Sequence, residues 1–317
     1  MTSIVDSLMI FFTSLFNIDA NLLLIPAIII PGVAIFIFMA LNVMLSVYFE
    51  RKVAAFMQDR LGPMEVGIFG WKGGKKFWGG IGQIFADTIK LLTKEDIMPD
   101  KADKVLMFLS PFIIVTGAIL TFIGVPFTEG LIVSDFNIGI LYIVAMSSVG
   151  VIGVILAGWS SNNKWSLYGA MRSAAQIISY EIPIGMGLLL VVIVCGSLQV
   201  NDIVAWQADN RWFIFHSPFT FIAFFMFYIS VVAETNRTPF DIPEAESELV
   251  AGWMTEFSGF KWSIFFMSEY ANMLIVSIVA SFVFLGGWLS PFTIFNIFPD
   301  SWLIFDGFYW GIFWLFT

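Results

Sequence analysis

The chain has 317 residues, of which 59% are hydrophobic and 12% are charged, about half the charged fraction of an average soluble domain. This composition excludes a soluble globular protein and predicts an all-α polytopic membrane protein with a single membrane domain over residues 1–317. One cysteine and one histidine cannot supply the ligands of an iron–sulfur cluster or a pair of axial haem ligands, so no metal site is predicted.

Apolar runs define the expected spans, because about 20 helical residues cross the hydrocarbon core of a bilayer. Segment 1–22 has apolar residues at helical spacing and is predicted to lie at the membrane interface or to lead into the first span. A seventh run begins near Ile304 and ends at Thr317, so we expect a truncated seventh span. The six complete spans are predicted at roughly 23–49, 105–125, 137–158, 180–199, 213–233 and 263–288.

The basic residues predict the orientation of these spans. All of the 15 Lys and Arg residues except Arg211 fall in the loops that follow the first, third and fifth spans. Because Lys and Arg are retained on the cytoplasmic side, loops 51–104 and 234–262 are predicted to be cytoplasmic and the N-terminus to lie outside.

The first cytoplasmic loop contains a segment with helical periodicity. Between Ile81 and Lys94, apolar residues share one face and Gln83, Asp87 and Lys90 share another, which predicts an interfacial amphipathic helix. Such a helix is either a plain membrane anchor or the border of an entrance for a lipid-soluble molecule. The chain has no glycine-rich phosphate loop, and nothing in it indicates nucleic-acid binding.

The loop 234–262 is strongly acidic, although it directly follows an apolar run. Asp241 and Glu244 flank Pro243 and are typical of a helix start, in which Asp241 caps free amides. Capping does not explain the remaining acids, so two interpretations stay open: a solvated loop, or a coupled cluster that handles protons. Glu181 at the predicted opening of the fourth span and Glu269 inside the sixth favour the cluster, because intramembrane carboxylates mark ion paths or buried pairs.

A second polar group lies at the exit from the first span, where Glu50 and Arg51 are followed by Arg60 and a Gly62-Pro63 turn. Basic residues at this boundary are commonly only a topology signal. The adjacent carboxylate and the rigid turn instead predict a cytoplasm-facing polar cavity lined by charges.

Several segments together resemble one known family. They are ERKVAAFMQDRLGP (50–63), FADTIKLLTKE (85–95), AGWSSNNKWSLYGAMRSAAQIISYE (157–181), AETNRTPFDIPEAESELVAGWMTEF (233–257), FFMSEY (265–270) and FLGGW (284–288). These segments resemble the membrane-embedded H subunit of the proton-pumping NADH:quinone oxidoreductase, which is bacterial complex I, and its mitochondrial counterpart, NADH dehydrogenase subunit 1.

The resemblance implies a role for two groups of residues. The quinone chamber and its mouth would include Glu50, Arg51, Arg60, Asp87, Arg237 and Asp241. A buried proton path toward antiporter-like subunits would include Tyr180, Glu181, Glu234, Glu244, Glu246, Glu248, Glu256 and Glu269.

The resemblance also implies quinone as the substrate, with no covalently bound cofactor on this chain and with flavin and iron–sulfur clusters only on partner subunits. The expected partners are peripheral-arm subunits, small and antiporter-like membrane subunits, and lipids of the bacterial inner membrane. The sequence departs from the family at Met64, where the family has Asn, in an apparent insertion over 70–80, and in the absence of a last helix after Thr317.

Three alternatives remain open on the sequence alone. The chain could be the related, quinone-independent component of a membrane-bound hydrogenase. It could be an ion transporter or channel, because acids within apolar spans fit an ion path alone. It could also be a membrane anchor whose charges only hold a peripheral arm.

Overall fold

The computed structural model describes residues 4–16, 20–64, 66, 80–128, 130–243, 246–290, 311–312 and 315. Over these ranges the chain is helical, and the only strand-like pairing that they contain is an isolated bridge between Thr128 and Leu131. The predicted all-α fold is therefore confirmed for the described part of the chain. The apparent insertion lies outside the described residues except for Gly80.

Within the described residues, five spans are long and apolar enough to cross a membrane. Residues Gly139–Ser160 form one of them from two abutting helices. The predicted run 213–233 is divided at Ser217, whose side chain caps the shorter apolar helix α11 in a capping box with Thr220. The predicted seventh span lies outside the described residues except for 311–312 and 315. The helices that matter below are α2 (Ala20–Met57), α5 (Lys104–Ile123), α6 (Gly139–Ser147), α7 (Val149–Ser160), α8 (Lys164–Cys195), α11 (Pro218–Glu234) and α13 (Gly259–Phe284).

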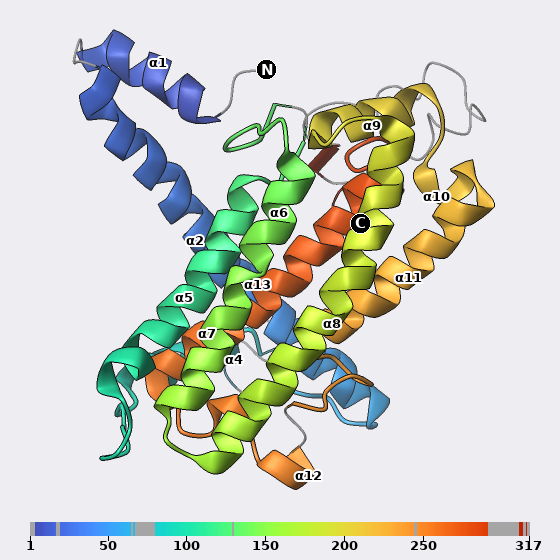
Figure 1. Cartoon of the computed structure of the whole chain (residues 1–317). Helices are drawn as coiled ribbons and strands as arrows, with labels where there is room; N and C mark the ends of the chain where they lie inside the picture. Colours follow the sequence, from blue (N-terminus) through green and yellow to red (C-terminus); the bar gives the residue numbers. More distant parts are fainter. Residues whose placement is uncertain are drawn as a thin grey trace.

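The helices form a bundle with two distinct ends (Figure 1). At one end lie α1 (Ile4–Phe16), α9 (Val200–Asp209) and α10 (Phe213–His216). At the other end lie α4 (Gly82–Thr93) and α12 (Glu246–Leu249), together with the end of α2 and the start of α13. The loops with most of the basic residues therefore meet at the end that carries α4.

Helix α8 begins much earlier than the predicted start at residue 180. Asn163 caps it by accepting a hydrogen bond from the amide of Trp165 at 3.0 Å, and the helix then continues to Cys195. Arg172 and Gln176 interrupt the apolar pattern, but both have polar partners in the fold, so the helix tolerates them. Glu181 therefore lies in the middle of α8, and its predicted position at the opening of a span is wrong.

The predicted helix start at Asp241 is also wrong. The short helix α12 begins at Glu246, five positions later in the chain, and Asp241 lies in an exposed irregular segment. Glu244 lies outside the described residues. Pro243 fixes the backbone of this segment without beginning a helix, so capping does not account for Asp241.

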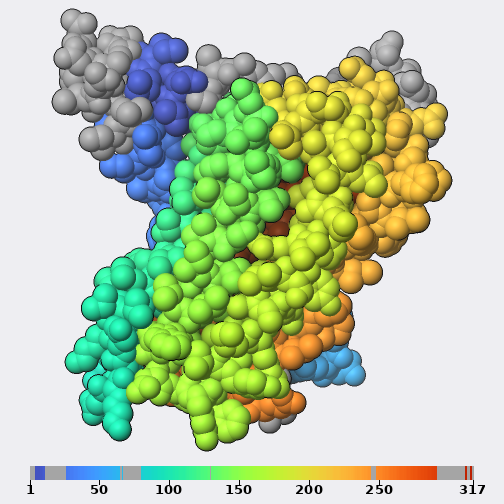
Figure 2. Space-filling view, in the orientation of Figure 1, coloured from blue at the N-terminus to red at the C-terminus, as the bar shows by residue number. Residues whose placement is uncertain are grey.

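A buried apolar core joins α5, α8, α11 and α13. Its fully buried members include Phe122, Leu188, Phe227 and Phe282, one from each of these helices. A second buried cluster near the α4 end contains Trp253 and Phe265. Figure 2 shows the outer face that α5, α6, α7 and α8 form, with the first part of α2 visible beside it and α4 largely hidden behind it.

Close helix packing at this end requires glycine. A Cβ atom on Gly169 would lie 2.8 Å from the backbone of Gly252, a contact that only a backbone shift could relieve. Gly185 in the same helix has open space around its Cα. The two glycines therefore form a matched pair for testing the packing of α8 against the acidic loop.

We expect Gly169→Ala to destabilise the fold by about 1–3 kcal/mol, because the added methyl group overpacks a backbone contact. Gly185→Ala is expected to be neutral or stabilising by up to about 1 kcal/mol through helix propensity. The measurement is the midpoint of thermal inactivation of the membrane-assembled protein. Equal midpoints for the two variants would contradict the packing described here.

Candidate functional site

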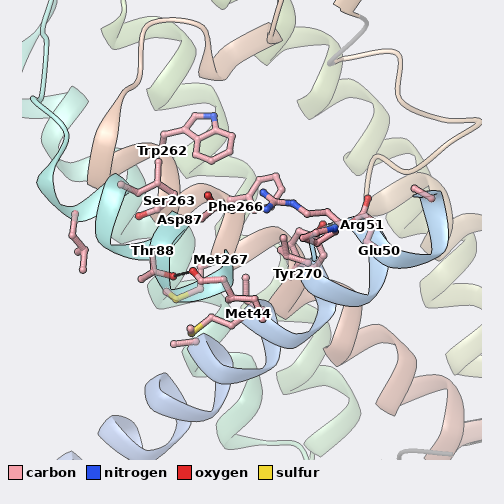
Figure 3. A pocket seen from close by; sticks show the side chains of 18 of the residues that line it. Met44, Glu50, Arg51, Asp87, Thr88, Trp262, Ser263, Phe266, Met267 and Tyr270 are labelled. Carbon is pink, nitrogen blue, oxygen red and sulfur yellow. Dashed lines mark hydrogen bonds and ion pairs between the residues drawn. The ribbon is translucent and has the colours of Figure 1, made fainter. Parts of the chain in front are cut away.

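A cavity of about 790 Å³ lies between α2, α4 and α13 at the basic end of the bundle (Figure 3). This volume is within the range of small-molecule sites. Its walls combine apolar side chains with a few charged groups. The wall includes Met44 of α2, Thr88 and Leu91 of α4, and Phe266 and Met267 of α13.

The apolar wall has an aromatic side along α13. Trp262 and Phe266 stack with ring centroids 4.9 Å apart, and Phe266 and Tyr270 follow at 5.0 Å. These residues are four apart and therefore share one face of the helix. Met44 from α2 also lines the cavity, as Figure 3 shows, so a planar apolar molecule meets rings and a flexible thioether.

Four of the residues predicted for a quinone chamber line this single cavity: Glu50, Arg51, Arg60 and Asp87. They come from α2, from the turn after it, and from α4. Met64 does not move Arg60 out of the cavity. The turn is held by Lys52, which donates a hydrogen bond to the carbonyl oxygen of Leu61 at 3.1 Å and contacts Met64.

The ion pair between Arg51 and Asp87 joins α2 to α4. Partial burial of Asp87 acts to raise the pKa of its carboxyl group, but hydrogen bonds from Arg51 and Gln83 outweigh this and hold the pKa below its usual range. The ion pair therefore stabilises the contact between α2 and α4 at neutral pH. This stabilisation is lost only in acid, as the pH falls through the lowered pKa of Asp87.

Arg237 lies just after α11 and connects the cavity to the interior of the bundle. Its guanidinium pairs with Glu50 at 3.4 Å and with Glu269 at 3.1 Å, and it lies over the ring of Tyr270 at 4.8 Å. Tyr270 donates a hydrogen bond to Glu50. Partial burial acts to lower the pKa of Arg237, but Glu269 and the other neighbours raise it, so the guanidinium stays charged.

A second, smaller cavity of about 70 Å³ lies on the inner side of Arg237. Glu234 and Glu269 both line it, together with Asn236 and Asn272. These polar groups, set among apolar side chains, and the size of the cavity suit a few ordered waters, because a water in liquid occupies about 30 Å³ and buried waters bind polar groups. Two of the acids predicted for a proton path therefore line one cavity.

Gln176 of α8 fixes the chain that carries Arg237. Its side-chain amide donates to the carbonyl oxygens of Ala233 at 2.8 Å and Phe240 at 2.7 Å. It also contacts the Asn236 side chain at 3.2 Å. The segment between Ala233 and Phe240 is therefore anchored to α8 at both of its ends.

Glu181 continues the acidic series within α8. The hydroxyl of Ser148, at the junction of α6 and α7, donates to the carboxylate of Glu181 at 2.6 Å. Glu181 is also near enough to Glu234 for their charges to interact. Among the described residues, the group that donates a hydrogen bond to Glu181 is therefore a neutral hydroxyl.

The remaining predicted residues have separate surroundings. Arg172 pairs with Glu248 at 2.9 Å, and the Glu248 side chain is 59% exposed. Asn163 donates to Glu256 at 2.7 Å, and the ring of Tyr180 contacts that of Phe240. Asp241 is exposed and does not line either cavity. Glu244 and the side chain of Glu246 lie outside the described residues.

Sequence reasoning missed three polar residues at the site: Tyr270, Asn272 and Ser148. Tyr270 directly follows Glu269 in FFMSEY, so its neighbour could have drawn attention to it. Asn272 lies three residues after Glu269 and shares its helical face, which is a usable signal. Ser148 carries no signal of its own, because a hydroxyl in an apolar helix commonly bonds only to its own backbone.

Comparison with known proteins gives the family. A family model described as NADH dehydrogenase matches residues 30–317. The H subunit of NADH-quinone oxidoreductase from Chlorobaculum tepidum is 50% identical over 250 residues, covering 78% of this chain and 67% of the relative. The chain belongs to the family of NADH-quinone oxidoreductase H subunits.

Further members of this family show the same likeness. The H subunit from Bacteroides fragilis is 49% identical over 263 residues, covering 82% of this chain and 70% of the relative. The H subunit from Chlorobium luteolum is 46% identical over 277 residues, covering 85% of this chain and 71% of the relative. The resemblance seen in the motifs is confirmed, and with it the expectation of one subunit of a multisubunit oxidoreductase. The five apolar helices and these bacterial relatives support a bacterial membrane protein.

We expect Arg237→Met to lower the midpoint of heat inactivation of the assembled protein, because the free energy of unfolding falls by about 1–3 kcal/mol. This is less than the loss for a fully buried pair, because Arg237 is partly exposed. Adding Glu269→Gln in the same chain is expected to restore part of the loss, since it removes one of the uncompensated carboxylates. Arg211→Met, at the opposite end of the bundle, is the control. Additive effects of the two substitutions would contradict the shared ion pair.

Proposed function

We propose that the chain is the membrane component that forms much of the quinone chamber of a proton-pumping NADH:quinone oxidoreductase. In this proposal it also couples quinone reduction to proton translocation through buried carboxylates. The observation that carries the proposal is the position of Arg237, which pairs with Glu50 of the larger cavity and with Glu269 of the inner cavity.

The larger cavity suits a lipid-soluble quinone. Rings of α13 and methionines of α2 and α13 provide an apolar surface for the ring and the isoprenoid tail. Arg51 lies at the charged end, where its guanidinium N–H groups can orient a carbonyl oxygen. The apolar outer face of α4, with Phe85 and Ile89 exposed, fits an access route from the membrane.

The chain requires an external source of electrons. Its single cysteine and histidine cannot hold an iron–sulfur cluster, so the two electrons must come from a partner protein. Quinone takes up these two electrons and two protons to become quinol. Flavin and iron–sulfur clusters are therefore proposed for the peripheral-arm partners, and quinone is a substrate.

Charge at the quinone provides the coupling. Negative charge that develops in the larger cavity competes with Glu269 for the guanidinium of Arg237, since the two lie on opposite sides of it. As Arg237 moves toward the quinone, Glu269 loses its counter-charge and gains affinity for a proton. The coupling is reciprocal, so the protonation state of Glu269 also affects the quinone.

The proton path continues from Glu269 across the inner cavity to Glu234. Waters bound by Asn236 and Asn272 would join the two carboxyl groups. From Glu234 the path leads to Glu181, whose partner Ser148 lies at the break between α6 and α7. Glu246, Glu248 and Glu256 are proposed to belong to the mouth of the path, where Arg172 and Asn163 hold two of them.

The orientation follows from the basic residues. The described Lys and Arg residues other than Arg211 lie in segments that meet at the α4 end, which we assign to the cytoplasm of the bacterial inner membrane. The end with α1 would then lie outside. The partners are the peripheral arm at the α4 end, and antiporter-like and small membrane subunits beside the bundle.

Filling the larger cavity should block quinone reduction. Met44→Trp places an indole in the cavity and is expected to lower NADH:quinone reductase activity of the assembled complex by at least about tenfold, because the quinone needs the same space. Leu45→Trp is the matched control, because Leu45 is the next residue of α2, is 52% exposed and does not line the cavity. Full activity in the Met44 variant would refute the larger cavity as the quinone site and would favour the membrane anchor.

Neutralising an acid of the inner cavity should separate electron transfer from pumping. Glu234→Gln is expected to leave quinone reduction largely intact and to reduce proton translocation per electron to about a tenth, because glutamine cannot carry a proton. Both rates are measured in inverted membrane vesicles. Asp209→Asn at the opposite end of the bundle is the control. An unchanged proton-to-electron ratio in the Glu234 variant would refute this path.

A further inference from the structure

Lys261 is a buried cation in an unfavourable place. Its side chain is only 8% exposed, and it lies in the first turn of α13. The N-terminal end of a helix has positive dipole character, so a lysine there destabilises the helix unless another group compensates. Burial adds a desolvation cost, which only a close partner offsets.

Asp96 is that partner. Its carboxylate lies 2.7 Å from the Lys261 ammonium group, and the Asp96 side chain is 40% exposed. The ammonium also contacts the sulfur of Met98 at 3.4 Å. Asp96 and Met98 lie in the segment that directly follows α4, so the pair connects the end of α4 to the start of α13.

Neighbouring contacts form one joint with this ion pair. The Ser258 hydroxyl donates to the carbonyl oxygen of Glu95 at 3.2 Å and accepts from the amide of Ile97 at 3.2 Å. Gly259 has a φ of +57°, and a Cβ atom there would lie 2.9 Å from the carbonyl oxygen of Lys94. The backbone at the start of α13 therefore lies directly against the end of α4.

The joint lies on the outer side of the cavity wall. Phe260 and Trp262 line the larger cavity, but Lys261 between them does not. The spacing between α4 and α13 sets the width of the cavity, because both helices contribute to its wall. The other fixed point of α4 is its ion pair with α2, between Asp87 and Arg51.

The outer face of α4 offers little else to hold it in position. Phe85, Ile89 and Leu92 are about half exposed or more, as expected for side chains that face lipid. Lipid contact does not fix the distance between α4 and α13, because apolar side chains slide against fluid acyl chains. Two ion pairs and the joint at Ser258 and Gly259 therefore supply the polar contacts that position this wall, beside the packing of the buried Ile84.

We propose that Lys261 and Asp96 are positioning residues that hold α4 against α13 at the spacing that admits a long-tailed, lipid-soluble quinone. This inference rests on the proposed function, because it takes the larger cavity as the quinone site. The reacting end of the cavity, with Glu50 and Arg51, keeps its own contacts. Loss of the pair therefore affects access and binding of the tail more than the reaction itself.

The test uses Lys261→Met in the assembled complex with quinones of long and short tail. We expect the KM for a long-tailed quinone to rise about five- to tenfold, with kcat unchanged and with little change in the KM for a short-tailed quinone. A purely structural role would instead lower the amount of active complex, and the rates of reduction of the long-tailed and the short-tailed quinone would fall equally. That result would overturn the proposal. Lys101→Met, an exposed lysine nearby, is the control.

Further variants keep the test decisive if Lys261→Met fails to assemble. Asp96→Asn changes the partly exposed partner and should raise the KM for the long-tailed quinone. Lys261→Arg keeps the positive charge and should leave this KM at the value of the unchanged protein. Exchanging the charges with Lys261→Asp and Asp96→Lys should also restore the KM. An assembled exchange variant that keeps the raised KM would overturn the pairing. If Met44→Trp leaves quinone reduction intact, the proposed function fails; if it blocks reduction while Asp96→Asn leaves every KM unchanged, only this inference fails.

Discussion

The site depends on one shared cation. Arg237 stands where α2, α13 and the chain after α11 meet, and it compensates carboxylates that come from the first two of these elements. Without it, Glu50 and Glu269 would face each other with Tyr270 between them. Glu269 is largely buried, whereas the Glu50 side chain is 51% exposed, so the guanidinium offsets a repulsion that falls mainly on Glu269.

The same requirement explains why the segment from Ala233 to Phe240 is anchored at both of its ends. A guanidinium can serve two carboxylates only if its backbone is held in register with both helices. Gln176 provides this by bonding carbonyl oxygens on both sides of Arg237. A polar residue that interrupts an apolar span is thus part of the support of the site. Glu248 and Glu256, which pair with Arg172 and Asn163, anchor the next part of the loop to α8 in a similar way.

The sequence predicts the fold class well because composition and apolar run length reflect the solvent around the helices. It also predicts that Glu50, Arg51, Arg60 and Asp87 belong together, through family motifs. It fails for α8, because the polar residues Arg172 and Gln176 find partners only in the folded chain. It could not assign Glu269 its counter-charge, and it missed Tyr270, whose bond with Glu50 joins positions 220 residues apart. Long-range pairs of this kind leave no periodicity in the sequence.

The geometry around Arg237 makes the proposed coupling sensitive to small changes of charge. With an effective dielectric constant of about 20, the attractions at 3.1 Å and 3.4 Å differ by only about 0.5 kcal/mol. A guanidinium balanced so closely responds to any charge that develops on one side. Protonation of Glu269, or negative charge on a quinone beside Glu50, changes the energy of the guanidinium by more than this difference of about 0.5 kcal/mol. A single cation between two cavities can therefore couple the redox state of a quinone in the larger cavity to the proton affinity of Glu269 in the inner cavity. This coupling needs no large movement of helices.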